Sequence, residues 1–155
     1  MASTSSNKQP LLVDHILHEV VSLDNRIIGQ MDVVGTNDAL QVLSAISTDG
    51  AILESIYTIS RSTTPHKVNL YFSSSFDYLR PTEAVFIGSI TAATTAGNVV
   101  EWDAAPKILA PFPQVGNEAQ FRALYVPKNT CLWAAVESAS NVTDAPLLGV
   151  QGGWY

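Results

Sequence analysis

The chain has 155 residues, which fits one domain large enough to bury a core without disulfide or metal support. Only 14% of its residues are charged, against about 25% in ordinary globular chains, and 46% are hydrophobic, which indicates a surface that partners cover. The net charge is −6 and no basic run is present, so the composition argues against nucleic-acid binding, which needs clustered Lys and Arg.

The first residues predict an arm followed by a short amphipathic segment. Residues 1–10 are small and polar, which is typical of a flexible arm, and residues 11–155 are expected to form one β-rich domain. No stretch resembles a signal peptide or approaches the roughly 20 apolar residues that cross a membrane. We therefore expect a protein that is assembled in the cytoplasm and has no membrane partner.

Residues 11–23 show pairs of apolar residues at helical spacing, and Pro10 suits a helix start. The sequence therefore predicts a short helix here. The β-branched residues in the segment leave an extended arm as the alternative.

Strand patterns begin near residue 40. Two apolar runs flank Thr48-Asp49-Gly50, and Asp-Gly between such runs predicts a hairpin. Apolar and polar residues alternate over 67–73, which predicts a strand with one buried face. A further strand is predicted over 84–92, followed by a turn at 94–98.

The second half of the chain continues in the same way. Prolines between 105 and 113 exclude a central strand and predict a loop or an extended edge segment. Strands are predicted over 121–126, 131–136 and 147–155, with a turn at 127–130. Seven or eight short strands separated by regular turns predict a single mainly β domain, an antiparallel β-sandwich or jelly roll.

The most site-like cluster is formed by Asp14, His15, His18 and Glu19. On a helix, two histidines three residues apart lie on one face and could hold a metal. The same residues are also the polar positions of an amphipathic helix, and only His66 remains as another histidine ligand. We favour the solvated helix face, and we expect no metal, no cofactor and no catalytic site.

The other reactive or aromatic residues have structural interpretations as well. His66 is interpreted as a loop histidine, and the single cysteine, Cys131, as a buried strand residue. Trp102, Trp133 and Trp154 could form a sugar-binding platform, although such tryptophans are more often core or interface residues. Trp154 and Tyr155 end the chain, which indicates an end tied either to the domain's own core or to a neighbour.

Residues 125–136, Tyr-Val-Pro-Lys-Asn-Thr-Cys-Leu-Trp-Ala-Ala-Val, resemble a hairpin of small virion proteins of tailed bacteriophages. The Ser/Thr-rich arm and the Ala/Thr-rich strand at 87–95 are similar to those of head-decoration and neck proteins. The resemblance implies a non-catalytic β-sandwich that binds a capsid shell, often as a trimer.

We accordingly expect a decoration or cement protein located in the virion, with a capsid or other virion protein as its partner. A tail, neck or fibre component, a carbohydrate- or receptor-binding module, and an enzyme on a sandwich fold remain the alternatives. The predicted interface residues are the apolar anchors after the arm and the aromatic chain end: Leu11, Leu12, Val13, Trp154 and Tyr155.

Overall fold

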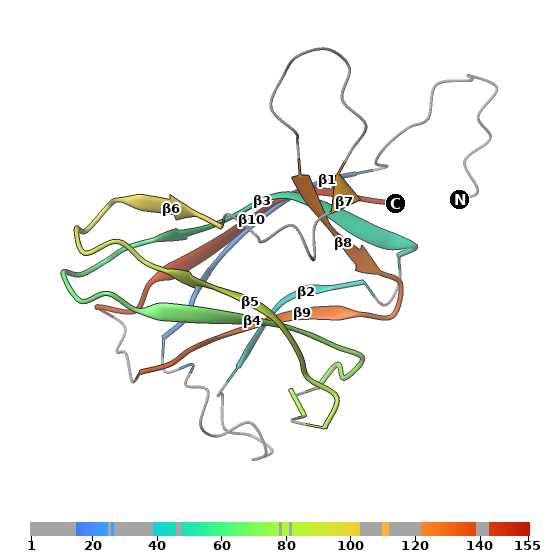
Figure 1. Cartoon of the computed structure of the whole chain (residues 1–155). Helices are drawn as coiled ribbons and strands as arrows, with labels where there is room; N and C mark the ends of the chain where they lie inside the picture. The colour runs from blue at the N-terminus through green and yellow to red at the C-terminus, as the bar shows by residue number, and fades with distance from the viewer. Residues whose placement is uncertain are drawn as a thin grey trace, which may run out of the picture.

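The computed structural model describes residues 15–24, 26, 39–45, 48–77, 79–80, 82–102, 110–111, 122–138 and 143–155. The predicted arm and the anchors Leu11, Leu12 and Val13 lie outside these ranges. Every regular element in the described ranges is a β-strand, and the strands form two antiparallel sheets packed face to face (Figure 1). The predicted mainly β sandwich is therefore confirmed. None of the described residues belongs to a helix long and apolar enough to cross a bilayer.

Two sheets, here called A and B, make the sandwich. Sheet A has the order β1-β10-β3-β8-β7, and a sixth strand, β6, also pairs with β3. Its strands are β1 (His15–Ser22), β3 (Gly50–Ile59), β6 (Val99–Glu101), β7 (Ala110–Pro111), β8 (Arg122–Pro127) and β10 (Leu147–Trp154). Sheet B has the order β2-β9-β4-β5. Its strands are β2 (Leu40–Ser44), β4 (Lys67–Ser73), β5 (Val85–Thr91) and β9 (Cys131–Val136).

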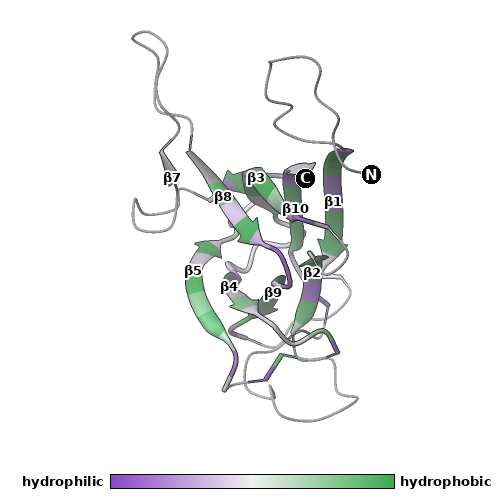
Figure 2. Ribbon diagram, turned by 90° about the vertical axis from the view of Figure 1, so that its right-hand side faces the viewer, coloured by the Kyte–Doolittle hydropathy of each residue, from purple (hydrophilic) through white to green (hydrophobic). Residues whose placement is uncertain are grey.

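The pairing follows the pattern of a long hairpin that has been rolled up. The first strand pairs with the last, β2 pairs with β9, β3 with β8, and β4 with β5, and these pairs fall alternately in sheets A and B. This nesting is the strand order of an eight-stranded jelly roll, with β6 and β7 as short additions to sheet A. Figure 2 shows sheet A above sheet B, with β1 and β2 on one side and β5 and β8 on the other.

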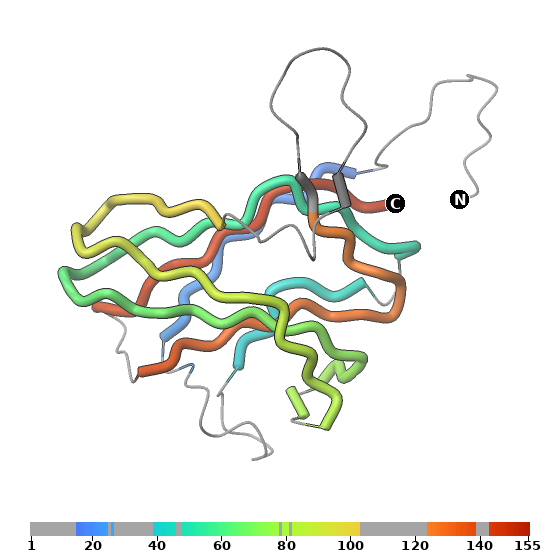
Figure 3. The backbone as a smooth tube through the Cα atoms, viewed as in Figure 1, coloured from blue at the N-terminus to red at the C-terminus, as the bar shows by residue number. Residues whose placement is uncertain are grey.

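Most of the strands predicted from alternation are confirmed, but two predicted pairings are wrong. β2 and β3 do not form a hairpin, because β2 belongs to sheet B and β3 to sheet A. The turn at 127–130 likewise joins β8 of sheet A to β9 of sheet B, instead of closing a hairpin (Figure 3). The β2–β3 and β8–β9 connections both pass from one sheet to the other. They are joined by hydrogen bonds from Asn129 N to Ala45 O (2.9 Å) and from Ala45 N to Thr130 O (3.0 Å).

The helix predicted over residues 11–23 is wrong for its described part. Residues 15–22 form strand β1, which pairs with β10 along its whole length. Leu17 is buried and Val21 packs against the core, whereas Ile16 and Val20 point outward and are exposed. Apolar residues on both faces of this edge strand produced the paired pattern that was interpreted as helical.

The core lies between the two sheets and is built from the inward-facing residues of both. Its largest fully buried side chains include Leu53, Leu70, Leu124, Leu132 and Leu148. Two tryptophans, Trp102 and Trp154, are partly buried at its margins. The inner faces of the sheets are therefore occupied by packing, and any binding surface must lie on an outer face, an edge or a loop.

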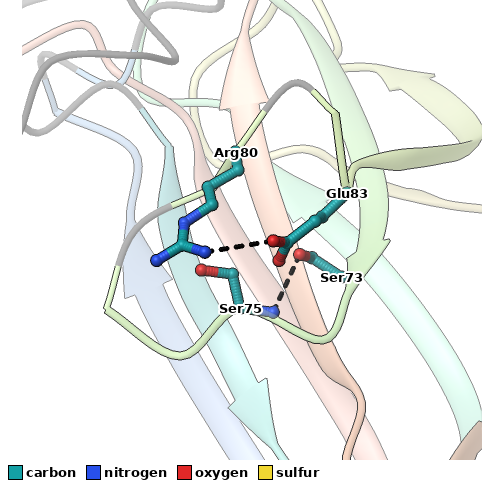
Figure 4. Close-up of polar contacts among 4 residues, drawn as sticks. All are labelled: Ser73, Ser75, Arg80 and Glu83. Atoms are coloured by element: carbon teal, nitrogen blue, oxygen red, sulfur yellow. Dashed lines mark hydrogen bonds and ion pairs between the residues drawn. The ribbon is translucent and has the colours of Figure 1, made fainter.

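The outer face of sheet B is largely closed. Cys131 and Trp133 of β9 and Tyr71 of β4 form a second apolar cluster with Leu79 of the connection between β4 and β5. Within this connection, Ser75 N donates to Ser73 Oγ (3.0 Å), and the Arg80 guanidinium pairs with the carboxylate of Glu83 (3.1 Å) (Figure 4). The connection thus covers this face and leaves the outer face of sheet A as the open one.

Candidate functional site

The open face of sheet A carries two rows of side chains that cross the central strands. In one row, His18 of β1, Gln151 of β10 and Ser55 of β3 are register partners. In the next row, Val20, Gly149, Tyr57 and Glu101 follow one another across β1, β10, β3 and β6. Because register partners in a sheet point to the same face, these residues form one continuous surface.

Tyr57 bridges three strands because residue 149 is a glycine. A Cβ at position 149 would collide with the Tyr57 ring, so the ring lies directly over the β10 backbone. From there the Tyr57 hydroxyl reaches β1, where its oxygen is 3.0 Å from His18 Nε2. One aromatic side chain therefore ties β3 to the edge strand across the outside of the sheet.

A second polar contact fixes the other end of this surface. The Ser55 hydroxyl donates to the carboxylate of Glu101 on β6 at 2.7 Å. The centre of the face is therefore polar and held by side-chain hydrogen bonds. Its margin at β1 is apolar, because Ile16 is 86% exposed and Val20 45% exposed.

The strand geometry removes the basis for the metal site considered for His15 and His18. Successive residues of a strand point to opposite faces, so side chains three apart lie on opposite sides of the sheet. Asp14 lies outside the described residues. Within the ranges that are described, no group of three His, Cys, Asp or Glu side chains is placed to hold a metal ion.

His66 precedes β4 in a loop, as predicted, but the loop packs inward. Its side chain is only 3% exposed, and Nδ1 lies 3.4 Å from Ser138 Oγ. Next to it, Lys67 pairs with Glu137 at 2.6 Å, and Asn69 Nδ2 donates to the same carboxylate at 3.3 Å. The Lys67 hydrogen bond, followed by that from Asn69, lowers the pKa of Glu137. This cluster fastens the end of β9 to β4.

The tryptophans form no exposed platform. Trp133 is 3% exposed beneath the connection between β4 and β5. Trp102 lies against Gly88 of β5, where a Cβ would collide with its indole ring, and Trp154 packs against the core. Each of the three is used in packing. Cys131 is fully buried, as predicted, and its burial raises the pKa of the thiol.

The chain end is tied to its own domain. Tyr155 N donates to Gly50 O (3.0 Å), and Asp49 N donates to Tyr155 O (3.4 Å). The Tyr155 ring lies against Tyr125, with the ring centres 6.1 Å apart, and its partial burial raises the pKa of the phenol. Trp154 therefore anchors the end to the core, and Tyr155 forms part of a surface with Tyr125.

The exposed apolar side chains of the edge strands could not be predicted from the sequence. Besides Ile16 and Val20 on β1, the large exposed apolar residues include Val85 (60%) and Phe86 (57%) on β5, the outer strand of sheet B. A strand with apolar residues on both faces carries no periodic signal that separates its exposed residues from its core residues. Their exposure follows from the position of β1 and β5 at sheet edges, which is known only from the folded structure.

The fold and the surface together define an eight-stranded jelly roll with apolar edge strands, an architecture used by viral capsid domains, lectins and cupins. Comparison with protein-family models, with curated proteins and with solved structures finds no match to the chain.

Proposed function

We propose that this chain is a non-catalytic structural protein of a virus particle that binds and stabilises an assembled capsid shell. The observation that carries the proposal is the apolar surface of the edge strands, Ile16 and Val20 on β1 and Val85 and Phe86 on β5. Large uncovered apolar side chains on edge strands favour contact with other protein. The jelly-roll order and the resemblance of residues 125–136 to phage virion proteins support the same proposal.

The arrangement suits attachment to a repeating surface. The two apolar edges belong to different sheets and lie on opposite sides of the sandwich (Figure 2), so one copy can touch two neighbours. Each such contact is small, but contacts repeated over a shell act together, and each can therefore be weak. The partner is a capsid or other virion protein, and copies of this chain associate with one another. The resemblance favours a trimer, whereas the open edge of β1 leads to the two-fold pair proposed in the next subsection.

The predicted anchors Leu11, Leu12 and Val13 stand two or more residues before the start of β1 in the sequence. In this proposal the arm orders when it binds, and these anchors offset the entropy that ordering removes. Trp154 contributes by holding the chain end in place, and Tyr155 offers its ring beside Tyr125.

The test is co-sedimentation of the protein with particles from cells that carry the gene. We expect the intact chain in the particle fraction, and we expect both deletion of residues 1–13 and the double change Val85→Ser with Phe86→Ser to reduce attachment. The matched control is Val99→Ser, a valine of similar exposure (59%) on β6 and thus on neither β1 nor β5, which should attach normally. Absence of the intact chain from all particle fractions would overturn the proposal, and its presence with tails alone would move it to a tail or neck role.

A receptor- or carbohydrate-binding module is the second candidate, and one observation favours it. Tyr125 is 47% exposed and forms an aromatic surface with Tyr155, beside the ion pair of Lys128 and Asp49 (3.0 Å). Exposed aromatic rings next to polar groups can stack on sugar rings. Glycan-array binding that is lost in Tyr125→Ala would support this candidate, and binding to no glycan would dismiss it.

A further inference from the structure

The outer strands of the sandwich differ in how well their open edges are protected against pairing, and one of them, β6, has only three residues. β2 has five residues and a register shift against β9, and the pairing of β5 with β4 is also shifted, between Leu70 and Tyr71. β8 and its neighbour β7 contain Pro127 and Pro111, which cannot donate a backbone hydrogen bond. Short strands, irregular register and proline are the features that prevent a sheet edge from recruiting another strand.

β1 has none of these features. It has eight residues, its register with β10 is unbroken from His15 to Ser22, and it contains no Pro, Lys or Arg. Among the strands that the structure describes, β10 is its single neighbour in sheet A, so only one side of its backbone is paired there. Its outward side chains at 16 and 20 are apolar and exposed. The strand has one charged side chain, Glu19, which alternates with Ile16 and Val20 and so lies off the outer face. A regular edge with an apolar outer face is suited to adding a strand.

We propose that β1 pairs with β1 of a second copy of this chain, antiparallel and about a two-fold axis, so that two A sheets become one continuous sheet. In such a pair, residues opposite one another point to the same face. Placing the axis at His18 sets Ile16 opposite Val20 of the second copy, and Val20 opposite its Ile16. The sequence of β1 is thus self-complementary on the outer face, which is what an isologous contact requires.

Neighbouring registers fit less well. Moving the axis to residue 19 keeps the outer face continuous but sets Ile16 opposite Ser22 and His18 opposite Val20. Both outer-face apolar pairs are then lost, although the number of paired residues stays the same. Leu17 comes opposite Val21 instead, but the domain's own core already packs these two side chains. The register centred on His18 also leaves the His18 side chains facing each other, each supported from behind by the hydroxyl of its own Tyr57 at 3.0 Å. Cross-strand side-chain pairs select the register of two strands, so the pairs of Ile16 with Val20 favour the register centred on His18.

The contact is small, since each copy contributes one strand. Interfaces of this size are weak or transient, so we expect a dissociation constant in the micromolar range. The proposal does not depend on the shell-binding role. A chain that dimerises without binding any particle satisfies it, and a chain that binds particles as a monomer does not.

Sedimentation equilibrium of the full chain, from micromolar to millimolar concentration, is the first measurement. We expect a monomer–dimer equilibrium that Ile16→Asp abolishes, because it sets a carboxylate opposite Val20 of the second copy. Ile16 is 86% exposed, so this change should not affect folding, which circular dichroism can check. Val99→Asp, at an exposed valine on β6, is the matched control and should dimerise like the wild type.

Cross-linking tests the register. In His18→Cys the two new thiols face each other across the axis, within reach of a disulfide, and mild oxidation should give a covalent dimer. Wild-type protein is the control for the native thiol, since Cys131 is fully buried, and Val20→Cys should cross-link poorly because its thiols lie off the axis. A monomer at all concentrations, a trimer, a dimer indifferent to Ile16→Asp, or cross-linking stronger at position 20 than at 18 would each overturn the proposal.

Discussion

Gly149 is the position where the open face of sheet A can be tested most directly. Replacing it with alanine places a methyl group in the volume of the Tyr57 ring, which must then swing away from β10. Displacing a packed side chain costs about 1–3 kcal/mol, and the exposed contact with His18 contributes a further ~0.5–1 kcal/mol. Alanine recovers about 0.5–1 kcal/mol over glycine in a strand, so we expect Gly149→Ala to lower the free energy of unfolding by about 2 kcal/mol.

The effect of Gly149→Ala on the free energy of unfolding should change sign when Tyr57 is absent. In a Tyr57→Ala background no ring remains to be displaced, and Gly149→Ala should stabilise the protein by about 0.5–1 kcal/mol. The coupling free energy between the two positions is then about 2–3 kcal/mol, within the range of residues in direct contact. In a domain of this size, 1 kcal/mol shifts Tm by roughly 2–4 °C, so the difference between backgrounds is measurable.

Urea unfolding followed by tryptophan fluorescence gives the four free energies of the cycle, provided that the m value stays constant. Gly152→Ala serves as the control on the same strand. At position 152 the added Cβ would collide with the backbone carbonyl of Ile52. The loss of stability caused by Gly152→Ala should therefore be the same with or without Tyr57→Ala. If Gly149→Ala lowers stability equally in both backgrounds, Tyr57 does not lie over the β10 backbone, and the described surface is incorrect.

Three further predictions concern the core, an exposed carboxylate and the thiol. Leu132→Ala, at a fully buried side chain between the sheets, should lower the free energy of unfolding by about 2–5 kcal/mol in urea, whereas the exposed Val99→Ala should change it by less than about 0.5 kcal/mol. Because the hydrogen bonds from Lys67 and Asn69 lower the pKa of Glu137 in the folded state, its contribution to stability is present above the ordinary glutamate value of 4.5 and lost as pH falls through the lowered value. Glu137→Gln should therefore make the acid loss of stability less steep, as measured by urea midpoints across that range. Cys131 is fully buried and its thiol pKa is raised, so Ellman's reagent should react with it only after unfolding; rapid reaction in native buffer would contradict its placement.

Apolar runs identified strands even where both faces of the strand are buried, as in β4 and β9, so the solvated face expected for residues 67–73 was wrong. Residues 131–136 were predicted as a strand and form β9, and residues 67–73 form β4. The prediction was wrong over residues 15–22, because Ile16 and Val20 are apolar on the exposed face. Periodicity reports where side chains point only if exposed positions are polar, and the edge strand of an interaction surface does not meet that condition.

Partner strands could not be predicted from the turns. Asp49-Gly50 does mark a change of direction, and Gly50 adopts a φ of +127° that favours glycine. A local turn signal, however, contains no information about which sheet the next strand joins, because that depends on residues distant in sequence. The contact of Tyr57 with His18 and Gly149 has the same origin, since strands β3, β10 and β1 meet only in the folded domain.

The position of β10 has a consequence for how the protein is made. In sequence it follows every other strand of the two sheets, yet it lies inside sheet A between β1 and β3. Until residues 147–154 have left the ribosome, β1 has no partner, and β3 exposes on one side the backbone groups that later pair with β10. We therefore expect sheet A to stay incomplete in the nascent chain until β10 has emerged, and the sandwich to close only then. During that interval, the exposed strand edges would be a natural binding site for molecular chaperones.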